Sequence, residues 1–293
     1  MKALLIAKFL DVDIRGEDCT VNGVRALDDR AEHTLVFAMG KLTDELLDVK
    51  HVCFIVSKAP SNTGFNAFIE VDNPKLAFAK VVNKFFLNDR EHVGKSVIHP
   101  TARVGKSIVM GDGCVVGSSV VIGKGTVLRN NVVIGDGVVI GEHCLVMSNA
   151  VIGEDGFNFA HEEDGTPVRM PHFGSVELGD HVEVGNGSMI DRGMFKNTMV
   201  NSYVKIDNLV YIAHNCVIGR GTQMAACAEV SGSCIIGERC WIGAGCSVKQ
   251  KIQIGDDCQV GVGAVVISDV QNGGTVVGNP ARVLKTDRKE RAK

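Results

Sequence analysis

An apolar residue recurs at every sixth position over most of the chain from residue 98 to residue 266, and glycine often follows it. The first run comprises Ile98, Val104, Met110, Val116, Ile122, Leu128, Ile134, Ile140, Val146 and Ile152. After Leu178, Val184 and Ile190, the second run comprises Val200, Ile206, Ile212, Ile218, Met224, Val230, Ile236, Ile242, Val248, Ile254, Val260 and Val266. A period of six matches neither the 3.6-residue repeat of a helix nor the alternation of a hairpin. It predicts short strands wound into a prism, with about 18 residues in each coil.

In such a prism the apolar positions point inward and stack on their equivalents about 18 residues away, with strands about 4.8 Å apart. Two segments interrupt the repeat: residues 154–177, EDGFNFAHEEDGTPVRMPHFGSVE, and residues 191–199. Long excursions from a rigid scaffold often bind a ligand or shape a site. We expect the 154–177 loop to do so, and a flap that only caps the prism is the alternative.

Residues 1–96 lack the six-residue repeat and have the pattern of a small α/β domain. Short strands are predicted at LVFAMG (35–40), HVCFIV (51–56) and AFIEV (67–71). Asp72-Asn73-Pro74 predicts the start of a helix, because proline is favoured in the first helical turn. The predicted organisation is therefore an α/β domain at 1–96, a mainly β prism of parallel strands at 97–276 and a C-terminal tail at 277–293.

Composition and charge narrow the function. The net charge of −3 gives no basic surface for nucleic acid. No apolar run approaches the roughly 20 residues of a membrane span, and the N-terminus does not have the pattern of a signal peptide, so we expect a soluble, cytoplasmic protein. The sequence has ten cysteines but no CxxC pair, so we expect buried, reduced thiols and no metal site.

The stretch VKIDNLVYIAHNCVIG (204–219) places His214 two residues after an apolar position, where side chains project outward. Asp207 and Asn208 precede it by one hexad, and Gly232 follows it by one coil. A histidine can remove the proton of an attacking amine, and a fixed backbone N–H can stabilise the oxyanion of a thioester carbonyl. This arrangement suits acyl transfer to an amine, with Asp207 or Asn208 orienting the imidazole. A surface histidine without a catalytic role is the alternative, and the other eight histidines share no spacing.

The segments GEDGFNFA (153–160), MIDRG (189–193) and VKIDNLVYIAHNCVIG resemble the UDP-3-O-acylglucosamine N-acyltransferase family, which N-acylates a lipid A precursor. NPKLAFA (73–79) extends the resemblance into the N-terminal domain. The resemblance implies a left-handed β-helix of hexapeptide repeats and a homotrimer with active sites between neighbouring subunits. It implies that His214 is the general base and that Gly232 supplies the oxyanion N–H. The residues it assigns to the sugar nucleotide are Phe37, Gly156, Phe157 and Phe159.

Three departures from the family pattern bear on the substrates. Lys251 stands where the family has a second histidine, and Gly40-Lys41-Leu42-Thr43 replaces the family's nucleobase-binding Asn-Pro-Lys-Tyr. In place of the family's C-terminal helical extension, VGVGAVVISDV and VVGNPARVLK resemble the closing coils of hexapeptide enzymes that use acetyl-CoA or another short acyl-CoA. We therefore expect an acyl-CoA donor. The residues expected to bind it, along the column of His214 and in the tail, are Gln250, Ser268, Asn279, Arg282 and Lys285.

Three hypotheses follow. The first is an N-acyltransferase that moves an acyl group from acyl-CoA to a nucleotide-linked amino sugar. The second is the lipid A enzyme itself, which would take hydroxyacyl chains from acyl carrier protein. The third is a non-catalytic, trimeric β-helix scaffold, which would not need a histidine and a glycine in one column.

Overall fold

The computed structural model describes residues 1–86, 92–93 and 95–284. The chain forms two compact units, Met1–Asp89 and Arg90–Lys293, and each is considered by itself. Within the described residues, no helix is long and apolar enough to cross a membrane.

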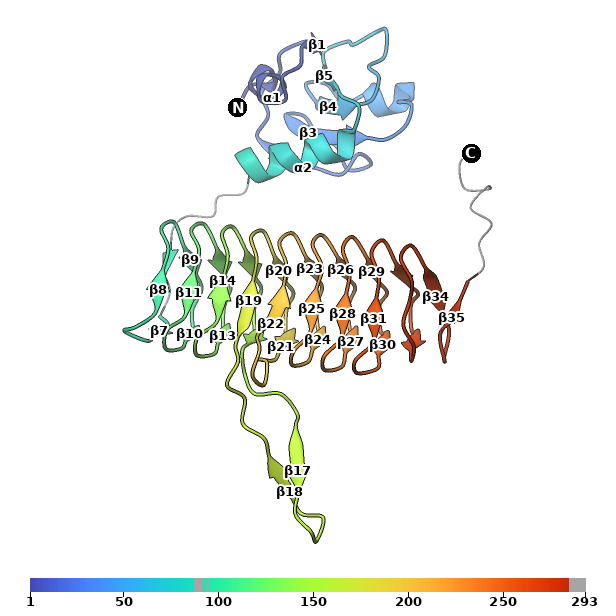
Figure 1. Ribbon diagram of the computed structural model, residues 1–293. Helices are drawn as coiled ribbons and strands as arrows, with labels where there is room; N and C mark the ends of the chain where they lie inside the picture. Colours follow the sequence, from blue (N-terminus) through green and yellow to red (C-terminus); the bar gives the residue numbers. More distant parts are fainter. Residues whose placement is uncertain (87–91, 94, 285–293) are drawn as a thin grey trace. The chain divides into compact units, whose positions relative to one another are not determined.

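The first unit is a five-stranded sheet with two α-helices and one 3-10 helix (Figure 1). The strands, in their order across the sheet, are β1 (Ile14–Gly16), β5 (Ala67–Glu70), β4 (Cys53–Val56), β3 (Thr34–Ala38) and β2 (Gly23–Val24). The helices are α1 (Ala3–Phe9), η1 (Asp44–Leu47) and α2 (Pro74–Phe85). The three predicted strands and the predicted helix are present. Asn73 caps α2, because its side chain accepts a hydrogen bond from the N–H of Leu76 (3.1 Å) and Pro74 begins the first turn.

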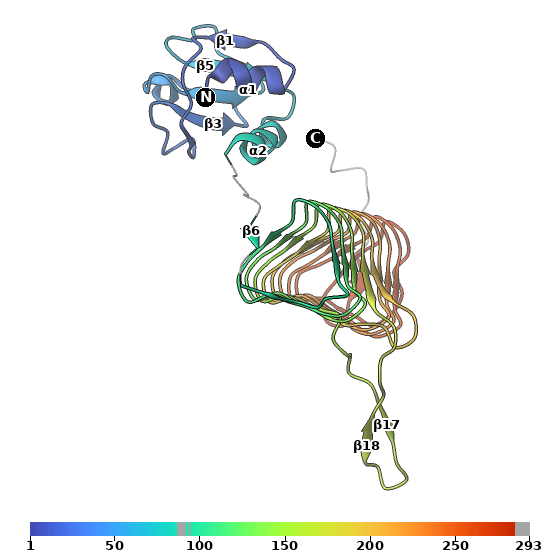
Figure 2. The same cartoon turned by 90° about the vertical axis from the view of Figure 1, so that its left-hand side faces the viewer.

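The second unit is a three-sided prism of parallel strands, and Figure 2 shows its triangular cross-section. The nine-stranded face consists of β7 (Val97–Ile98), β10 (Val115–Val116), β13 (Val133–Ile134), β16 (Val151–Ile152), β21 (Met189–Ile190), β24 (Tyr211–Ile212), β27 (Glu229–Val230), β30 (Ser247–Val248) and β33 (Val265–Val266). The eight-stranded face consists of β8 (Arg103–Val104), β11 (Val121–Ile122), β14 (Val139–Ile140), β19 (Val176–Leu178), β22 (Thr198–Val200), β25 (Val217–Ile218), β28 (Ile235–Ile236) and β31 (Gln253–Ile254).

The eleven-stranded face completes the prism. It consists of β6 (His92–Val93), β9 (Val109–Met110), β12 (Val127–Leu128), β15 (Leu145–Val146), β20 (Glu183–Val184), β23 (Lys205–Ile206), β26 (Gln223–Met224), β29 (Trp241–Ile242), β32 (Gln259–Val260), β34 (Thr275–Val277) and β35 (Arg282–Val283). Its last pair, β34 and β35, is antiparallel. Because β6 pairs with β9, the prism begins slightly before the six-residue repeat becomes visible in the sequence.

The predicted mainly β solenoid of hexapeptide repeats is confirmed, and the apolar positions of the repeat form its core. Strands one coil apart pair in register, for example Ile212 with Val230, and both side chains are fully buried. The predicted thiol positions line the same core, where Cys216 donates a hydrogen bond to the carbonyl of Ser231 (3.2 Å). Nine of the ten cysteines are buried, and Cys227 is the exposed one.

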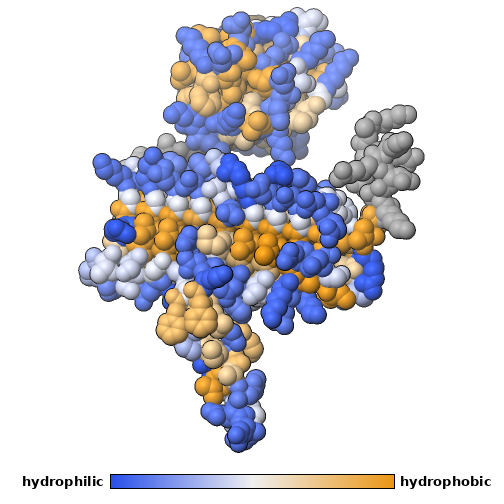
Figure 3. Space-filling model, viewed as in Figure 1, coloured by the Kyte–Doolittle hydropathy of each residue, from blue (hydrophilic) through white to orange (hydrophobic). Residues whose placement is uncertain are grey.

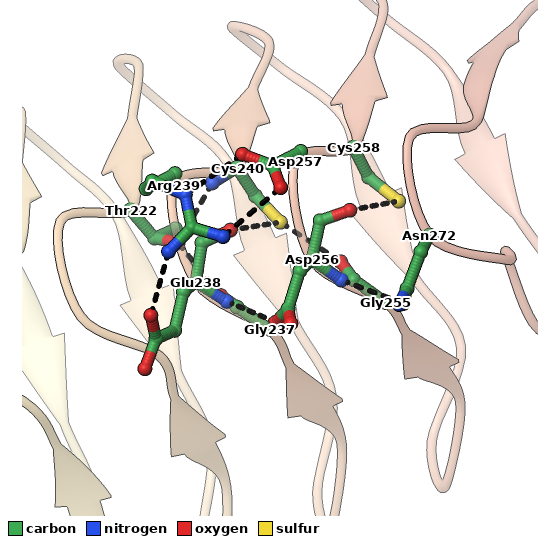
Figure 4. A network of polar contacts seen from close by, with 10 residues as sticks. All are labelled: Thr222, Gly237, Glu238, Arg239, Cys240, Gly255, Asp256, Asp257, Cys258 and Asn272. Atoms are coloured by element: carbon green, nitrogen blue, oxygen red, sulfur yellow. Dashed lines mark hydrogen bonds and ion pairs between the residues drawn. The ribbon is translucent and has the colours of Figure 1, made fainter.

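Polar side chains connect successive coils at the corners of the prism. Figure 4 shows one such corner, where the carboxylate of Asp256 accepts from the N–H of Glu238 (2.8 Å) and the side chain of Asn272 accepts from the N–H of Asp256 (3.0 Å). Arg239 forms ion pairs with Asp257 and Glu238 at the surface. The contacts of Asp256 and Asn272 satisfy turn N–H groups that the short strands leave unpaired.

The predicted loop at 154–177 leaves the prism after β16 and returns in β19, so its last two residues, Val176 and Glu177, belong to the eight-stranded face. β16 pairs directly with β21 across the insertion, with Ile152 opposite Ile190. The loop carries an antiparallel hairpin of β17 (Phe159–His161) and β18 (Pro167–Arg169), which projects from the prism in Figures 1 and 2. Its base is therefore held beside the coil that precedes His214.

Candidate active site

His214 lies at the corner between the nine-stranded and eight-stranded faces, two residues after β24. The register of β24, β27, β30 and β33 places Gly232, Gln250 and Ser268 at the equivalent positions of the next three coils. The column inferred from 18-residue spacing is therefore present in the structure. Arg192 precedes His214 in the same column, because β21 pairs with β24.

The imidazole of His214 is half-buried and oriented by the next residue in the chain. Its Nδ1 lies 3.1 Å from Oδ1 of Asn215. The Asn215 amide is fixed in turn, because its Oδ1 accepts from the N–H of Met194 (3.1 Å) and its Nδ2 donates to the carbonyl of Lys196 (2.9 Å). Since Oδ1 can only accept, Nδ1 of His214 carries the proton. The lone pair of the neutral imidazole is therefore on Nε2, where a base needs it.

Gly232 lies directly against the reactive side of this imidazole. A Cβ on Gly232 would be 2.8 Å from both Cε1 and Nε2 of His214, so only glycine fits without moving the ring. The coils are tied together here, since the N–H of Ser233 donates to the carbonyl of His214 (2.9 Å) and the N–H of Lys251 donates to that of Gly232 (3.0 Å). Among the hydrogen bonds of the described residues, none uses the N–H of Gly232. This N–H is available to an oxyanion beside Nε2.

The excursion loop covers His214 near its Cβ and Cδ2. A Cβ on Gly156 would be 3.0 Å from Cδ2 of His214 and 3.1 Å from Oδ2 of Asp191. Arg169 of the hairpin donates to the carbonyl of Gly156 (3.2 Å), and Arg192 donates to the carbonyl of Gly153 (2.7 Å) at the point where the loop departs. The close approach of the backbone to two side chains explains the glycine at position 156.

A buried acidic group, Asp191, lies beside His214 and under Gly156. Asp191 is 8% exposed, and its Oδ2 accepts a hydrogen bond from the hydroxyl of Tyr211 at 2.5 Å. Burial raises the pKa of Asp191, while the Tyr211 hydrogen bond and nearby His214 oppose that rise. Burial also raises the pKa of Tyr211, which keeps the phenol protonated as the donor.

A second imidazole packs against His214 from the loop. The rings of His172 and His214 meet edge to face with centroids 5.5 Å apart. His172 is buried, and neither of its ring nitrogens has a hydrogen-bond partner among the described residues. Burial lowers the pKa of His172 and favours its neutral form. No spacing in the sequence marks this residue, because it lies in the loop that leaves the prism and not in the repeat.

The prediction that Asp207 or Asn208 orients His214 is wrong for this chain. Both residues follow β23 and lie at the corner between the eleven-stranded and nine-stranded faces, since one hexad advances the chain by one face. Oδ1 of Asn208 accepts from the N–H of Asn186 (2.7 Å), and Oδ1 of Asp207 accepts from the N–H of Asn208 (2.7 Å). The orienting residue is Asn215, which stood next to His214 in the sequence.

The predicted donor residues lie along the solenoid toward its C-terminal end. Gln250 and Ser268 are exposed in the column of His214. Ser268 and Arg282 line one pocket of about 300 Å³, and Asn279 is exposed nearby in the chain. Lys285 lies outside the described residues. The structure therefore brings Ser268 and Arg282 together, and neither is in contact with His214.

The predicted sugar-nucleotide residues fall into two groups. Phe37 belongs to the first unit, where its ring packs on Phe78 of α2 with centroids 4.8 Å apart. Phe157 is 80% exposed and meets the ring of Phe159 at 4.9 Å, and Arg169 stacks over Phe159. Gly156 is the member of this set that touches His214. In the described part of the chain, no group of three or more His, Cys, Asp or Glu side chains is arranged to hold a metal ion.

Comparison with known proteins places the chain in a family. The bacterial transferase hexapeptide (six repeats) model matches residues 119–154 and 233–268. UDP-3-O-acylglucosamine N-acyltransferase of Neisseria meningitidis is 46% identical over 245 residues, covering 74% of this chain and 69% of the relative. The Campylobacter lari protein of the same name is 42% identical over 249 residues, covering 79% of this chain and 78% of the relative. The chain belongs to the UDP-3-O-acylglucosamine N-acyltransferase family. The resemblance inferred from the sequence is therefore confirmed.

Other members of the UDP-3-O-acylglucosamine N-acyltransferase family match over shorter stretches. The chain spans 22% of the length of the Chlorobium chlorochromatii relative, at 51% identity over 78 residues, and 64% of a Francisella tularensis relative, at 34% identity. Among solved structures, UDP-N-acetylglucosamine O-acyltransferase of Moraxella catarrhalis aligns with a TM-score of 0.61 and 29% identity. That alignment covers 66% of this chain and 74% of the other, and it supports the same solenoid fold.

Proposed function

We propose that this protein transfers an acyl group from a thioester to the amino group of a UDP-linked 3-O-acylglucosamine, a cytoplasmic step of lipid A synthesis. The names of the relatives support this acceptor, which refines the broader expectation of a nucleotide-linked amino sugar. The observation that carries the proposal is the facing pair of His214 Nε2 and the Gly232 backbone. Asn215 tethers Nδ1, so the free lone pair is on Nε2, and Nε2 lies beside the backbone of Gly232.

The reaction follows from this geometry. The amine nitrogen attacks the thioester carbonyl carbon and forms the C–N bond, while Nε2 of His214 takes a proton from the nitrogen. The negative charge that develops on the carbonyl oxygen is stabilised by the N–H of Gly232. When the intermediate collapses, the C–S bond breaks and the leaving thiolate receives the proton from His214. The amide and the free thiol are the products, and the protein returns to its starting state.

The donor is proposed to be an acyl-CoA. An extended pantetheine arm can follow the exposed column from Gly232 past Gln250 and Ser268. Arg282 shares a pocket with Ser268, and the paired N–H donors of its guanidinium group can bind a phosphate of the donor. Arg282→Ala should raise KM for acyl-CoA with little change in kcat. An unchanged KM for acyl-CoA, or turnover with acyl carrier protein alone, would exclude this donor site.

A homotrimer is proposed as the working assembly. Outward-facing residues of the solenoid include exposed apolar side chains such as Val139 and Ile235, and Figure 3 shows an apolar band along the solenoid. Burying such a band between copies removes apolar surface from water. Light scattering should give three times the 31.3 kDa chain mass, and a stable monomer would contradict the assembly.

The central experiment measures thiol release from acyl thioesters with UDP-3-O-acylglucosamine as acceptor. His214→Ala should lower kcat by about two to four orders of magnitude while the fold is retained. His161→Ala is the matched control, because His161 is exposed on the hairpin strand β17. Retention of more than about a tenth of the wild-type kcat by His214→Ala would remove the general-base role. No turnover by the wild type with any thioester would favour a non-catalytic scaffold.

A further inference from the structure

Asp191 is a buried carboxylate that the reaction above does not use. It belongs to the segment just after β21, one coil before His214, and its N–H donates to the carbonyl of Ile212 (2.9 Å). Its Oδ2 and the Cδ2 of His214 both lie within 3.1 Å of the point where a Cβ on Gly156 would stand. The two side chains are therefore neighbours, with the backbone of Gly156 covering them from the loop.

The site needs a negative charge at this place. When Nε2 takes a proton, His214 becomes an imidazolium in a half-buried position, and a buried cation is costly without an opposite charge nearby. The partner of Nδ1 is the amide of Asn215, which orients the ring but is neutral. Orientation and charge compensation must therefore come from different residues in this protein, unlike a triad in which one carboxylate does both.

The other charged and titratable groups around Asp191 and His214 do not supply a negative charge beside the imidazole. Asp155 is exposed on the loop, and Glu229 interacts with Tyr211 on its other side. Burial lowers the pKa of His172 and favours its neutral form, so it neither supplies a negative charge nor competes as a cation.

Three other groups also face the cluster. Arg169 is bound to the carbonyl of Gly156, and Arg192 is bound to the carbonyls of Gly153 and Asp136. The third is the thiol of Cys216, whose pKa is raised by its contact with Cys234 and by burial.

We infer that Asp191 is the charge partner of His214: its carboxylate stabilises the imidazolium that forms when Nε2 accepts the proton of the amine. Asp191 acts through His214 and is therefore a positioning residue. Tyr211 holds the carboxylate in place with its 2.5 Å hydrogen bond, and Gly156 excludes solvent from between the two groups. This inference deepens the proposed function and rests on its assignment of His214 as the base.

The first test measures the electrostatic interaction between Asp191 and His214 in the absence of substrate. The Cε1–H signal of His214 is followed by NMR as pH is varied, with His214→Gln identifying the signal. Asp191→Asn removes the charge but keeps an acceptor for Tyr211, so the titration midpoint of His214 should move to lower pH by about one unit. Asp191→Glu, which keeps the charge, should stay near the wild type. Asp164→Asn is the matched control, because Asp164 is an exposed carboxylate at the tip of the same loop.

The second test uses the pH dependence of kcat/KM. A general base acts in its deprotonated form, so kcat/KM should rise with pH along an acid limb. In Asp191→Asn this acid limb should move to lower pH by the same amount, and kcat should fall about tenfold because a weaker base remains. A fall in activity with no movement of the limb or of the NMR midpoint would overturn the inference and leave Asp191 a structural residue.

The two proposals fail in different ways. If wild-type protein shows no acyl transfer while the NMR midpoint moves as expected, the proposed function fails and the charge coupling stands. If His214→Ala abolishes transfer but Asp191→Asn leaves the midpoint unmoved, the coupling alone is wrong. Should Asp191→Asn fail to fold, Asp191→Ser removes the same charge and retains a smaller acceptor for Tyr211, and the same midpoint shift is required of it.

Discussion

Oδ1 of Asn215 lies 3.1 Å from Nδ1 of His214, although the two residues are adjacent in the chain. The contact is possible because Asn215 occupies the left-handed region of backbone conformation (φ +62°), where asparagine is tolerated better than most residues. The turn that closes the corner of the prism thus also orients the imidazole of His214, the base of the proposed reaction.

Removal of this amide should disorder the imidazole without straining the turn. Asn215→Gly keeps the left-handed backbone, so the fold should persist. The tether at Nδ1 is lost, and we expect kcat to fall by about 10- to 100-fold because the base is no longer held in position. Steady-state kinetics together with a thermal melt would separate this effect from unfolding. Wild-type kcat in a folded Asn215→Gly protein would show that the tether is unnecessary.

Gly232→Ala tests the close approach of the two coils. Its new Cβ would stand 2.8 Å from Cε1 and Nε2 of His214, so the ring must move away from the oxyanion N–H. We expect kcat to fall by about 10²- to 10³-fold with a smaller change in KM. The control is Gly23→Ala in the first unit, where a Cβ meets no atom within 4 Å. Equal activity of the two variants would contradict the role of Gly232.

His172 should make the fold sensitive to acid. Burial lowers the pKa of His172 in the folded state. As the pH falls below about 6.5, the unfolded chain therefore binds a proton at this residue before the folded chain does. Stability contributed by neutral His172 is therefore present above that pH and lost below it. His172→Phe should melt at a temperature less dependent on pH between about 5 and 7.

The same variant has an expected effect at neutral pH. Because both ring nitrogens of His172 are buried without a partner in the described structure, replacing the imidazole with an apolar ring should raise the free energy of unfolding by about 1 kcal/mol. His143→Phe, at an exposed position, serves as the comparison. A destabilised His172→Phe protein would mean that a bound water or ligand normally pairs with this imidazole.

Thiol labelling tests the burial of the cysteine core. Cys227 is exposed at a turn and the other nine thiols are buried, so a native sample should react rapidly at one thiol per chain and at all ten after denaturation. Burial also raises the pKa of thiols such as Cys246, to about 11, and keeps them in the unreactive protonated form. Rapid labelling of several thiols in the native state would contradict the packing. Protection of Cys227 as well would indicate that another copy covers its turn.

Much of this molecule follows from the sequence alone. The six-residue period predicts the solenoid because a strand of two residues and a tight turn repeat with it, and every inward position must be apolar. The same arithmetic correctly places Gly232 one coil after His214. It also predicts the interruption at 154–177, since a polar segment cannot occupy the core positions of the prism.

Other features depend on the tertiary structure. Periodicity describes residues that follow the coil, whereas His172 reaches His214 through a hairpin that leaves the coil and returns. Asp207 lies at a different corner from His214, because one hexad moves a residue to the next corner of the prism. Asp191 and Tyr211 become partners through the pairing of β21 with β24, and their burial depends on Gly156 crossing above them. The sequence by itself determined the scaffold and the shared column of His214 and Gly232, because both follow from a local repeat. Only the fold decided which groups surround His214, because loop closure and strand register bring them from separate parts of the chain.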